Sequence, residues 1–158
     1  MTTVKRGELK RVDEHLRFAL PRLSKAHAKV RYHRDDPLHP HQLDLSEAQC
    51  SQIIVNLVNN AIEAIPPERL GEVRVRCRET EGRLSFEVCD NGDGIPEALL
   101  EEIFEPFFTT KRGRGGTGLG LASARSLVTK AGGALTVRST SEGARFYVEI
   151  PLIEVRSR

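Results

Sequence analysis

Residues 46–65 read SEAQCSQIIVNLVNNAIEAI, and this stretch decides the kind of fold the chain adopts. Its Ser-x-x-Gln beginning has the form of a capping box, in which two side chains satisfy free backbone N–H groups at a helix start. At about 100° per residue, the apolar side chains gather on one side of that helix. They are Ile54, Leu57, Val58, Ala61, Ile62 and Ile65. Because Pro66-Pro67 ends the pattern, the sequence predicts an amphipathic helix over 46–65 that packs against a core.

The opposite side of this helix is polar and carries Gln49, Gln52, Asn56, Asn60 and Glu63. Asn56, Asn60 and Glu63 stand at positions i, i+4 and i+7, so they form one column along the helix. Asparagine is a poor helix former because its amide competes for backbone hydrogen bonds, so asparagines in mid-helix cost stability. Two interpretations stay open: oxygen ligands for Mg²⁺, which prefers hard oxygen donors, or a solvated polar face.

The rest of the chain alternates predicted helices with predicted hairpins. Strands with alternating apolar and polar residues are expected at 30–33, 73–77, 84–88, 135–138 and 145–150, and the last four form two β-hairpins. Helices are expected over 8–28 with a break or kink at Pro21, over 97–103, and over 119–131 with a stop at Gly132-Gly133. The order predicts an α+β fold: a two-layer α/β sandwich whose mixed, mostly antiparallel sheet is covered on one face by helices.

Length and composition narrow the class of protein. The 158 residues favour one domain, expected over 8–153, with residues 1–7 and 154–158 as tails. A net charge of +2 lacks the one-sided basic field of a nucleic-acid-binding protein. No run reaches the length of a membrane span, and three cysteines without a CxxC pair suggest a reducing cytosol. We therefore expect a cytoplasmic chain that contacts neither nucleic acid nor membrane.

A second informative segment is the turn Asp90-Asn91-Gly92-Asp93-Gly94, which follows a predicted strand. Its glycines let the backbone turn sharply and approach a ligand closely. The Asp90 carboxylate can accept a hydrogen bond from an exocyclic amino group such as that of adenine. A calcium loop is excluded, because Gly92 stands where a third-position Asp or Asn is needed and no closing Glu follows. A plain Asn-Gly turn remains an alternative.

The third segment is the glycine-rich loop 113–120, which leads into a predicted helix. Its GxGxxG spelling is not a dinucleotide fingerprint, since no strand precedes it and Arg138 stands where an acidic residue is required. It is not a P-loop either. Free N–H groups at a helix start can hold phosphate oxygens, and Lys111, Arg112 and Arg114 add positive charge. A surface loop without a ligand remains the alternative.

Two further groups of residues are lesser candidates. The histidines His33, His39 and His41 lack a Cys or carboxylate at ligand spacing, which makes metal binding the less favoured interpretation. The arginines at 74, 76 and 78 alternate along a predicted strand, so they form either a solvated strand face or a partner surface.

With these segments in place, the chain resembles the catalytic ATP-binding domain of bacterial sensor histidine kinases, over about residues 12–151. That family is grouped with DNA gyrase, the heat-shock chaperone ATPases and the mismatch-repair ATPases, and its fold is the Bergerat-type α/β sandwich with a mobile lid. Four ordered motifs carry the resemblance: residues 52–64 look like the N box, 90–94 like the G1 box, 104–111 like the F box and 116–121 like the G2 box.

The resemblance implies ATP and Mg²⁺ as cofactors. Asn60 would coordinate Mg²⁺ with Asn56 nearby, Asp90 would bind the adenine amino group, and Phe107 and Phe108 would anchor the lid. The implied nucleotide-binding residues are Asn60, Glu63, Ala64, Asp90, Gly92, Gly94, Ile95, Phe107, Thr109, Thr110, Lys111, Gly116, Thr117, Gly118, Leu119 and Gly120. The implied catalytic residues are Asn56, Asn60 and Lys111.

The implied chemistry is transfer of the γ-phosphoryl group to a histidine, in which the protein mostly positions the reactants and neutralises charge. That histidine is expected on a dimerisation domain, in the same longer protein or in trans, with a response regulator as the next partner. The family's phosphoacceptor motif is not found in the sequence: His15 is followed by Leu16, and Leu20 stands at the Pro position. We therefore expect an excised catalytic domain or a stand-alone relative, in the cytoplasm or as the cytosolic part of a membrane-bound sensor.

The sequence departs from the family pattern at two positions. Glu63 stands where the family often has a basic residue. Ala144 stands where the family often has a Thr that assists adenine binding, so another hydroxyl or a water would have to serve. A stand-alone anti-sigma-like serine kinase or binding module usually lacks the Phe-Phe-Thr-Thr-Lys segment at 107–111. A gyrase-like ATPase usually has a Glu base where Asn56 stands, and an amide cannot act as a base. The histidine-kinase interpretation is therefore favoured.

Overall fold

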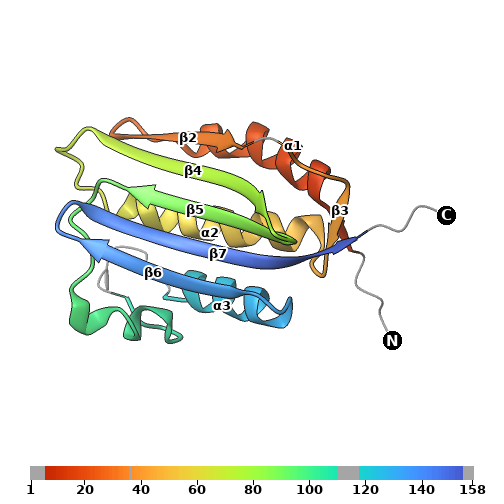
Figure 1. Ribbon diagram of the computed structural model, residues 1–158. Coiled ribbons are helices and arrows are strands. Elements are labelled where there is room, and N and C mark those ends of the chain that lie inside the picture. Colours follow the sequence, from red (N-terminus) through yellow and green to blue (C-terminus); the bar gives the residue numbers. More distant parts are fainter. Residues whose placement is uncertain (1–5, 36, 110–117, 155–158) are drawn as a thin grey trace.

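The computed structural model describes residues 6–35, 37–109 and 118–154. Within these ranges the elements follow the order β1 (Gly7–Glu8), α1 (Leu9–Ala19), η1 (Leu20–Leu23), β2 (Ala28–Arg34), β3 (His41–Leu43), α2 (Glu47–Glu63), β4 (Gly71–Thr80), β5 (Arg83–Asp90), η2 (Glu97–Leu99), η3 (Glu102–Phe104), α3 (Gly120–Lys130), β6 (Ala134–Thr140) and β7 (Gly143–Glu154). The elements marked η are short 3₁₀ helices. Figure 1 shows one sheet with α1, α2 and α3 behind it.

The strands form one sheet in the order β1-β3-β7-β5-β4-β2, with β6 also paired to β7. The long strand β7 joins its parts, because it pairs with β5, β6 and β3. Every pairing of named strands is antiparallel except that of β2 with β4, which is parallel. The predicted fold class, a mixed and mostly antiparallel sheet with helices on one face, is therefore confirmed.

The core lies between the sheet and the helices α1, α2 and α3, and the sequence of α2 explains its central part. The predicted capping box is present: the Gln49 N–H donates to Ser46 Oγ at 3.1 Å, and the Ser46 N–H donates to Gln49 Oε1 at 3.0 Å. Every residue predicted on the apolar side of this helix is at least 96% buried, among them Leu57 at 0% exposure. Burial of such a side chain contributes about 1.5–3 kcal/mol, so the helix is held mainly by this face.

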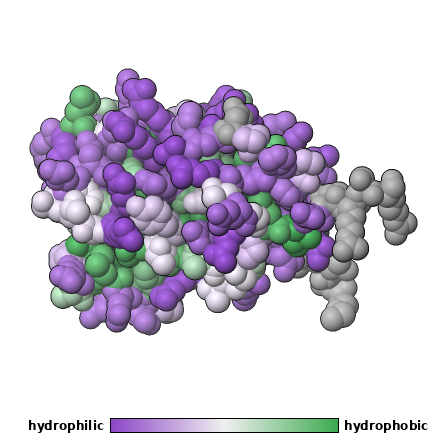
Figure 2. Space-filling view, in the orientation of Figure 1, coloured by the Kyte–Doolittle hydropathy of each residue, from purple (hydrophilic) through white to green (hydrophobic). Residues whose placement is uncertain are grey.

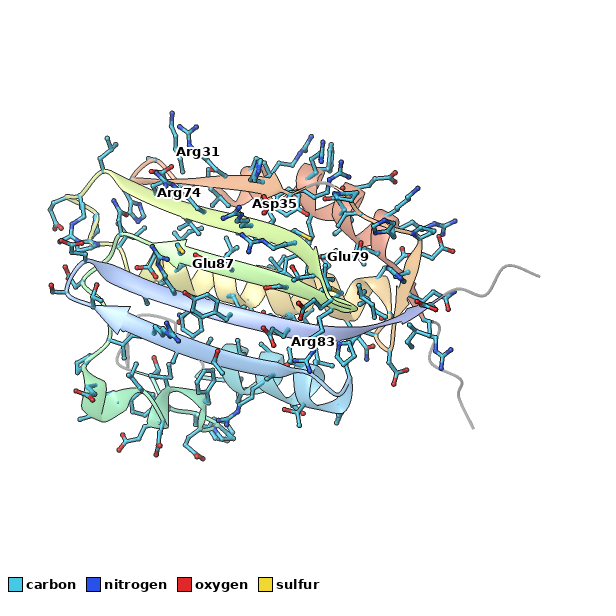
Figure 3. The ribbon with its side chains drawn as sticks, in the orientation of Figure 1. Arg31, Asp35, Arg74, Glu79, Arg83 and Glu87 are labelled. Carbon is cyan, nitrogen blue, oxygen red and sulfur yellow. The ribbon has the colours of Figure 1, made fainter. Side chains whose placement is uncertain are left out.

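The other face of the sheet is polar, as the alternation along β4 predicts. Figure 2 shows a largely hydrophilic surface on this side of the molecule. Arg74 lies 3.0 Å from Glu72, and both Arg76 and Arg78 contact Asp35, at 2.7 and 3.0 Å. Figure 3 labels Arg74 and Asp35 on this face. The arginines therefore form ion pairs along a solvent-exposed strand face, an arrangement that fits both a solvated face and a partner surface.

The sequence-based expectations differ from the structure in several places. The helix predicted over 8–28 ends as α1 at Ala19 and continues as the 3₁₀ helix η1, since Pro21 cannot donate the next helical hydrogen bond. The helix predicted over 97–103 is instead the two 3₁₀ helices η2 and η3. The short strands β1 and β3 were not predicted, and through them Gly7 and Glu154, expected in the tails, join the sheet. Among the described residues, no helix is long and apolar enough to cross a membrane.

Candidate functional site

A cavity of about 450 Å³ lies where α2, the turn after β5, the 3₁₀ helices and the start of α3 meet. Its size is within the usual range for small-molecule sites, roughly 300–1,000 Å³. The lining residues are Asn56, Asn59, Asn60, Glu63, Ala64, Asp90, Asp93, Gly94, Ile95, Pro96, Leu99, Ile103, Phe108, Thr109, Gly118, Gly120, Leu121 and Ala144. The three segments singled out in the sequence thus contribute to one cavity.

Asp90 is the last residue of β5, and only one of its two carboxylate oxygens accepts hydrogen bonds from the described residues. Its Oδ1 accepts hydrogen bonds from the Gly92 N–H at 2.9 Å and the Ala144 N–H at 3.3 Å. Its Oδ2 is buried and has no hydrogen-bond partner among the described residues. Burial raises the pKa of this carboxyl, while the two backbone N–H donors act to lower it. Because a buried acceptor without a partner is costly, Oδ2 is suited to an N–H donor of a ligand.

The turn that follows Asp90 is packed so tightly that two of its glycines have no room for a side chain. A Cβ at Gly92 would lie 2.5 Å from the carbonyl oxygen of Ala64 at the end of α2. Gly94 has φ +78°, and a Cβ there would overlap the carbonyl oxygen of Thr140 on β6. The turn is therefore wedged between α2 and the β6–β7 hairpin, which fixes the position of Asp90 at its start.

A hydroxyl group anchors the far end of this turn. The Ile95 N–H donates to Ser139 Oγ at 2.6 Å, and Ser139 pairs with Ala144 across the β6–β7 hairpin. Ser139 is thus the hydroxyl next to the position where the sequence offers Ala144. It holds the turn, and it is not among the residues that line the cavity. The sequence alone did not single it out, although its place opposite Ala144 in a predicted hairpin was a usable signal.

The polar column of α2 faces the cavity. Asn56, Asn60 and Glu63 all line it, together with Asn59. The Asn56 amide donates through Nδ2 to the Gly120 carbonyl at 3.2 Å, which ties α2 to the start of α3. The described residues contain no group of three or more His, Cys, Asp or Glu able to hold a metal. A cation at this wall would depend on amide and carboxylate oxygens together with ligand phosphate and water, which is a donor set that suits Mg²⁺.

The segments on either side of residues 110–117 meet at the cavity rim. The Phe107 N–H donates to the Gly118 carbonyl at 3.0 Å, and Phe108 and Thr109 line the cavity. Phe107 itself has φ +67°, is 68% exposed and is not among the residues that line the cavity. At Gly120 the helix α3 begins, and its first backbone N–H groups have no partner within the helix. Such a helix start favours anions such as phosphate.

The predicted site residues divide into three groups. Those that line the cavity are Asn56, Asn60, Glu63, Ala64, Asp90, Gly94, Ile95, Thr109, Gly118 and Gly120. Gly92, Phe107 and Leu119 are not among the lining residues, although Gly92 bonds Asp90 and Phe107 bonds Gly118. Thr110, Lys111, Gly116 and Thr117 lie outside the described residues.

The structure also adds lining residues that were not named as site residues from the sequence, although Asn59, Asp93 and Leu121 lie within its motifs. They are Asn59, Asp93, Pro96, Leu99, Ile103 and Leu121. Leu99 and Ile103 are apolar residues four positions apart in the stretch predicted as a helix, which was the available signal. The histidines lie elsewhere: His39 and His41 contact Glu79 at 3.0 and 2.9 Å.

These features define a class: an α/β sandwich with a small-molecule cavity between its central helix and a glycine-rich segment. Residues 46–154 match the family model for histidine kinase-, DNA gyrase B- and HSP90-like ATPases, and the chain belongs to this family. Over 110 residues, 66% of this chain, it is 46% identical to the two-component sensor PprA of Pseudomonas aeruginosa. The chain spans only 12% of the length of PprA.

Solved structures of histidine kinases share the fold. The nucleotide-free catalytic domain of histidine kinase ThkA superposes with a TM-score of 0.77 at 29% identity, over 94% of this chain and 96% of that one. ThkA has also been solved with the response regulator protein TrrA, where the TM-score is 0.72 at 25% identity over 93% and 41% of the chains. Full-length ShkA in complex with AMPPNP matches with a TM-score of 0.78 at 26% identity, over 99% of this chain and 33% of that one.

Proposed function

We propose that this chain is the catalytic ATP-binding domain of a sensor histidine kinase. In this role it binds Mg-ATP and donates the γ-phosphoryl group to a histidine on a separate dimerisation domain, in two-component signal transduction. The observation that carries the proposal is the buried Oδ2 of Asp90, an acceptor without a partner among the described residues, in a cavity that Asn56 and Asn60 also line. That full-length ShkA has been solved in complex with AMPPNP, an ATP analogue, supports a nucleotide as the ligand.

The base of the nucleotide is proposed to lie against the turn after β5. Asp90 Oδ2 would accept a hydrogen bond from the adenine amino group, since Oδ1 already accepts from two backbone N–H groups. The side chains of Ile95, Leu99 and Ile103 supply apolar surface for the ring. This arrangement recognises an amino group and disfavours a base with a carbonyl oxygen in the same place.

The phosphates are proposed to lie between α2 and the start of α3. Asn60 and Asn56 would hold Mg²⁺ through their carbonyl oxygens with Glu63 nearby, and a bound Mg²⁺ neutralises phosphate charge. The α3 start at Gly120 would face phosphate oxygens. We also keep Thr110, Lys111, Gly116 and Thr117 as proposed phosphate contacts, although they lie outside the described residues. Gly92, Phe107 and Leu119 would shape the turn and lid beside the cavity.

The proposed partners follow from the chemistry and from the relatives. A γ-phosphoryl acceptor histidine would come from a dimerisation domain, within a longer protein or in trans. A response regulator is the proposed next partner, because ThkA has been solved with one. Since ATP is the proposed substrate, we place the domain in the cytoplasm, on its own or as the cytosolic part of a longer sensor. An ATPase of the gyrase type is less favoured, because Asn56 cannot act as the base that activates water.

The proposal is tested in two stages. In the first, the chain is titrated with AMPPNP by calorimetry, with and without Mg²⁺; heat of binding that increases with Mg²⁺ supports it, and no binding at millimolar nucleotide refutes it. In the second, a histidine-bearing dimerisation domain and radiolabelled ATP are supplied. Acid-labile, base-stable phosphate on that domain is expected. Acid-stable phosphate on a serine of a partner protein would instead favour the serine-kinase alternative.

A further inference from the structure

Arg69 lies in the connection between α2 and β4, and its guanidinium holds the turn after β5 at two points. Its Nη1 donates to the carbonyl oxygen of Asn91 at 2.8 Å. Its Nη2 donates to Asp93 Oδ1, also at 2.8 Å. Asn91 directly follows Asp90 in the sequence, and Asp93 lines the cavity. One side chain from outside the cavity therefore contacts both the backbone and a carboxylate of the turn that carries the proposed base-reading group.

The side chain of Asn91 connects the same two segments from the opposite direction. Its Oδ1 accepts from the Glu72 N–H at 2.8 Å, and its Nδ2 donates to the Leu70 carbonyl at 3.2 Å. Residues 69–72 and 91–93 are thus joined by four hydrogen bonds. The Gly92 N–H that orients Asp90 Oδ1 lies inside this braced stretch. A shift of the stretch would therefore change the direction of the Asp90 carboxylate.

The guanidinium also acts on the charge of the cavity wall. Glu63, Asp90 and Asp93 all line the cavity, and a nucleotide brings further negative charge. Arg69 pairs with one of these carboxylates. Its planar fork reaches the Asn91 carbonyl and the Asp93 carboxylate at once, which the single ammonium of a lysine does not reproduce.

We infer that Arg69 is a positioning residue for base recognition: it holds the Asn91–Asp93 stretch so that Asp90 Oδ2 points at the amino group of the base. This inference rests on the proposed function, because it presupposes an adenine nucleotide in the cavity. Arg69 acts through the turn and does not line the cavity itself. The readout is consequently the preference for adenine, a quantity that a general loss of stability leaves unchanged.

The test compares the dissociation constants of ATP and ITP, measured by calorimetry with Mg²⁺. ITP has a carbonyl oxygen where ATP has the amino group, so correctly oriented Asp90 favours ATP. In Arg69→Ala we expect this preference to fall about three- to tenfold, the effect of one misdirected hydrogen bond. Arg69→Lys keeps the positive charge and is expected to recover only part of the preference. The matched control is Arg83→Ala, which removes an exposed arginine paired with Glu149 at 3.2 Å on the outer sheet face.

The outcomes separate this inference from the proposed function. An unchanged ATP preference in Arg69→Ala, or equal weakening of ATP and ITP, overturns the positioning role while leaving nucleotide binding in place. Full recovery in Arg69→Lys also overturns it, because charge alone would then be sufficient. If the unmodified chain binds neither nucleotide, or binds both equally, the proposed function or the role of Asp90 fails, and the inference fails with it. Should Arg69→Ala not fold, the Arg69→Lys comparison decides the question.

Discussion

Replacing Asp90 by Asn tests the base-reading proposal most directly, because the change leaves the shape of the side chain almost intact. The Gly92 and Ala144 N–H groups lie 2.9 and 3.3 Å from Oδ1, and an Asn carbonyl oxygen keeps both hydrogen bonds. The amide NH₂ then occupies the place of Oδ2, which is buried without a partner among the described residues. An acceptor for the adenine amino group becomes a donor that faces another donor.

The size of the effect follows from the hydrogen bond that is lost. A hydrogen bond to a charged group contributes about 1.5–3 kcal/mol, and about 1.4 kcal/mol corresponds to a tenfold change in Kd. We expect Asp90→Asn to weaken ATP binding roughly ten- to hundredfold. ITP should be weakened far less, because the new N–H donor suits its carbonyl oxygen. Calorimetric titration of both nucleotides measures this; equal weakening of the two, or unchanged affinity for ATP, would falsify the reasoning.

The same substitution is expected to stabilise the protein when no nucleotide is bound. Burial raises the pKa of Asp90 above its ordinary value of 3.8, so the folded state binds this proton more tightly than the unfolded chain. The resulting stability is fully present below pH 3.8 and is lost as the pH rises through the folded-state pKa. The Tm of Asp90→Asn should therefore exceed that of the unmodified chain at neutral pH but not at acid pH, by about 2–4 °C per kcal/mol. Glu87→Gln, on the outer face of the same strand, is the control; a Tm difference independent of pH contradicts the explanation.

Three further predictions follow from the described residues. Asn60→Ala should remove the Mg²⁺ dependence of nucleotide binding in a calorimetric titration, whereas Gln52→Ala, on the exposed polar side of α2, should retain it; equal behaviour of the two would contradict the metal proposal. Leu57→Ala should lower the free energy of unfolding by about 2–5 kcal/mol in urea, because Leu57 is 0% exposed, and a loss below about 1 kcal/mol would argue against tight packing there. Gly94→Ala should destabilise the protein more than Gly82→Ala in thermal unfolding: both have positive φ, but only Gly94 lacks room for a Cβ.

Local patterns predicted the parts of the fold that local interactions determine. The capping box of Ser46 and Gln49 involves residues three positions apart, and the apolar side of α2 follows from helical periodicity alone. The two hairpins were likewise predicted from alternation and turn residues. Both are present, as the antiparallel pairs β4–β5 and β6–β7. Where sequence neighbours supply both partners of an interaction, the sequence is enough to place it.

Other elements depend on partners far along the chain, so the sequence gives little sign of them. The strand β1 has only two residues, and it pairs with β3, which in turn pairs with the end of β7. The cavity shows the same division. Asp90, Asn56 and Asn60 were predicted from their motifs, whereas Asp93 and the bracing Arg69 come together through a contact between segments more than twenty residues apart. Such a contact leaves no periodic signal at either end.

The arrangement around Asp90 links affinity for a nucleotide to the stability of the fold. The turn packs against the carbonyl of Ala64 at Gly92 and against that of Thr140 at Gly94, which leaves no room for a side chain at either glycine. Within this tight packing the protein keeps Oδ2 as a buried acceptor without a partner among the described residues, at a free-energy cost that a ligand N–H group removes. Relief of this cost adds to the binding free energy, and binding in turn stabilises the folded state by mass action. ATP should accordingly raise the Tm of the unmodified chain more than that of Asp90→Asn at the same saturating concentration, and an equal rise in both would show that Oδ2 takes no part in binding.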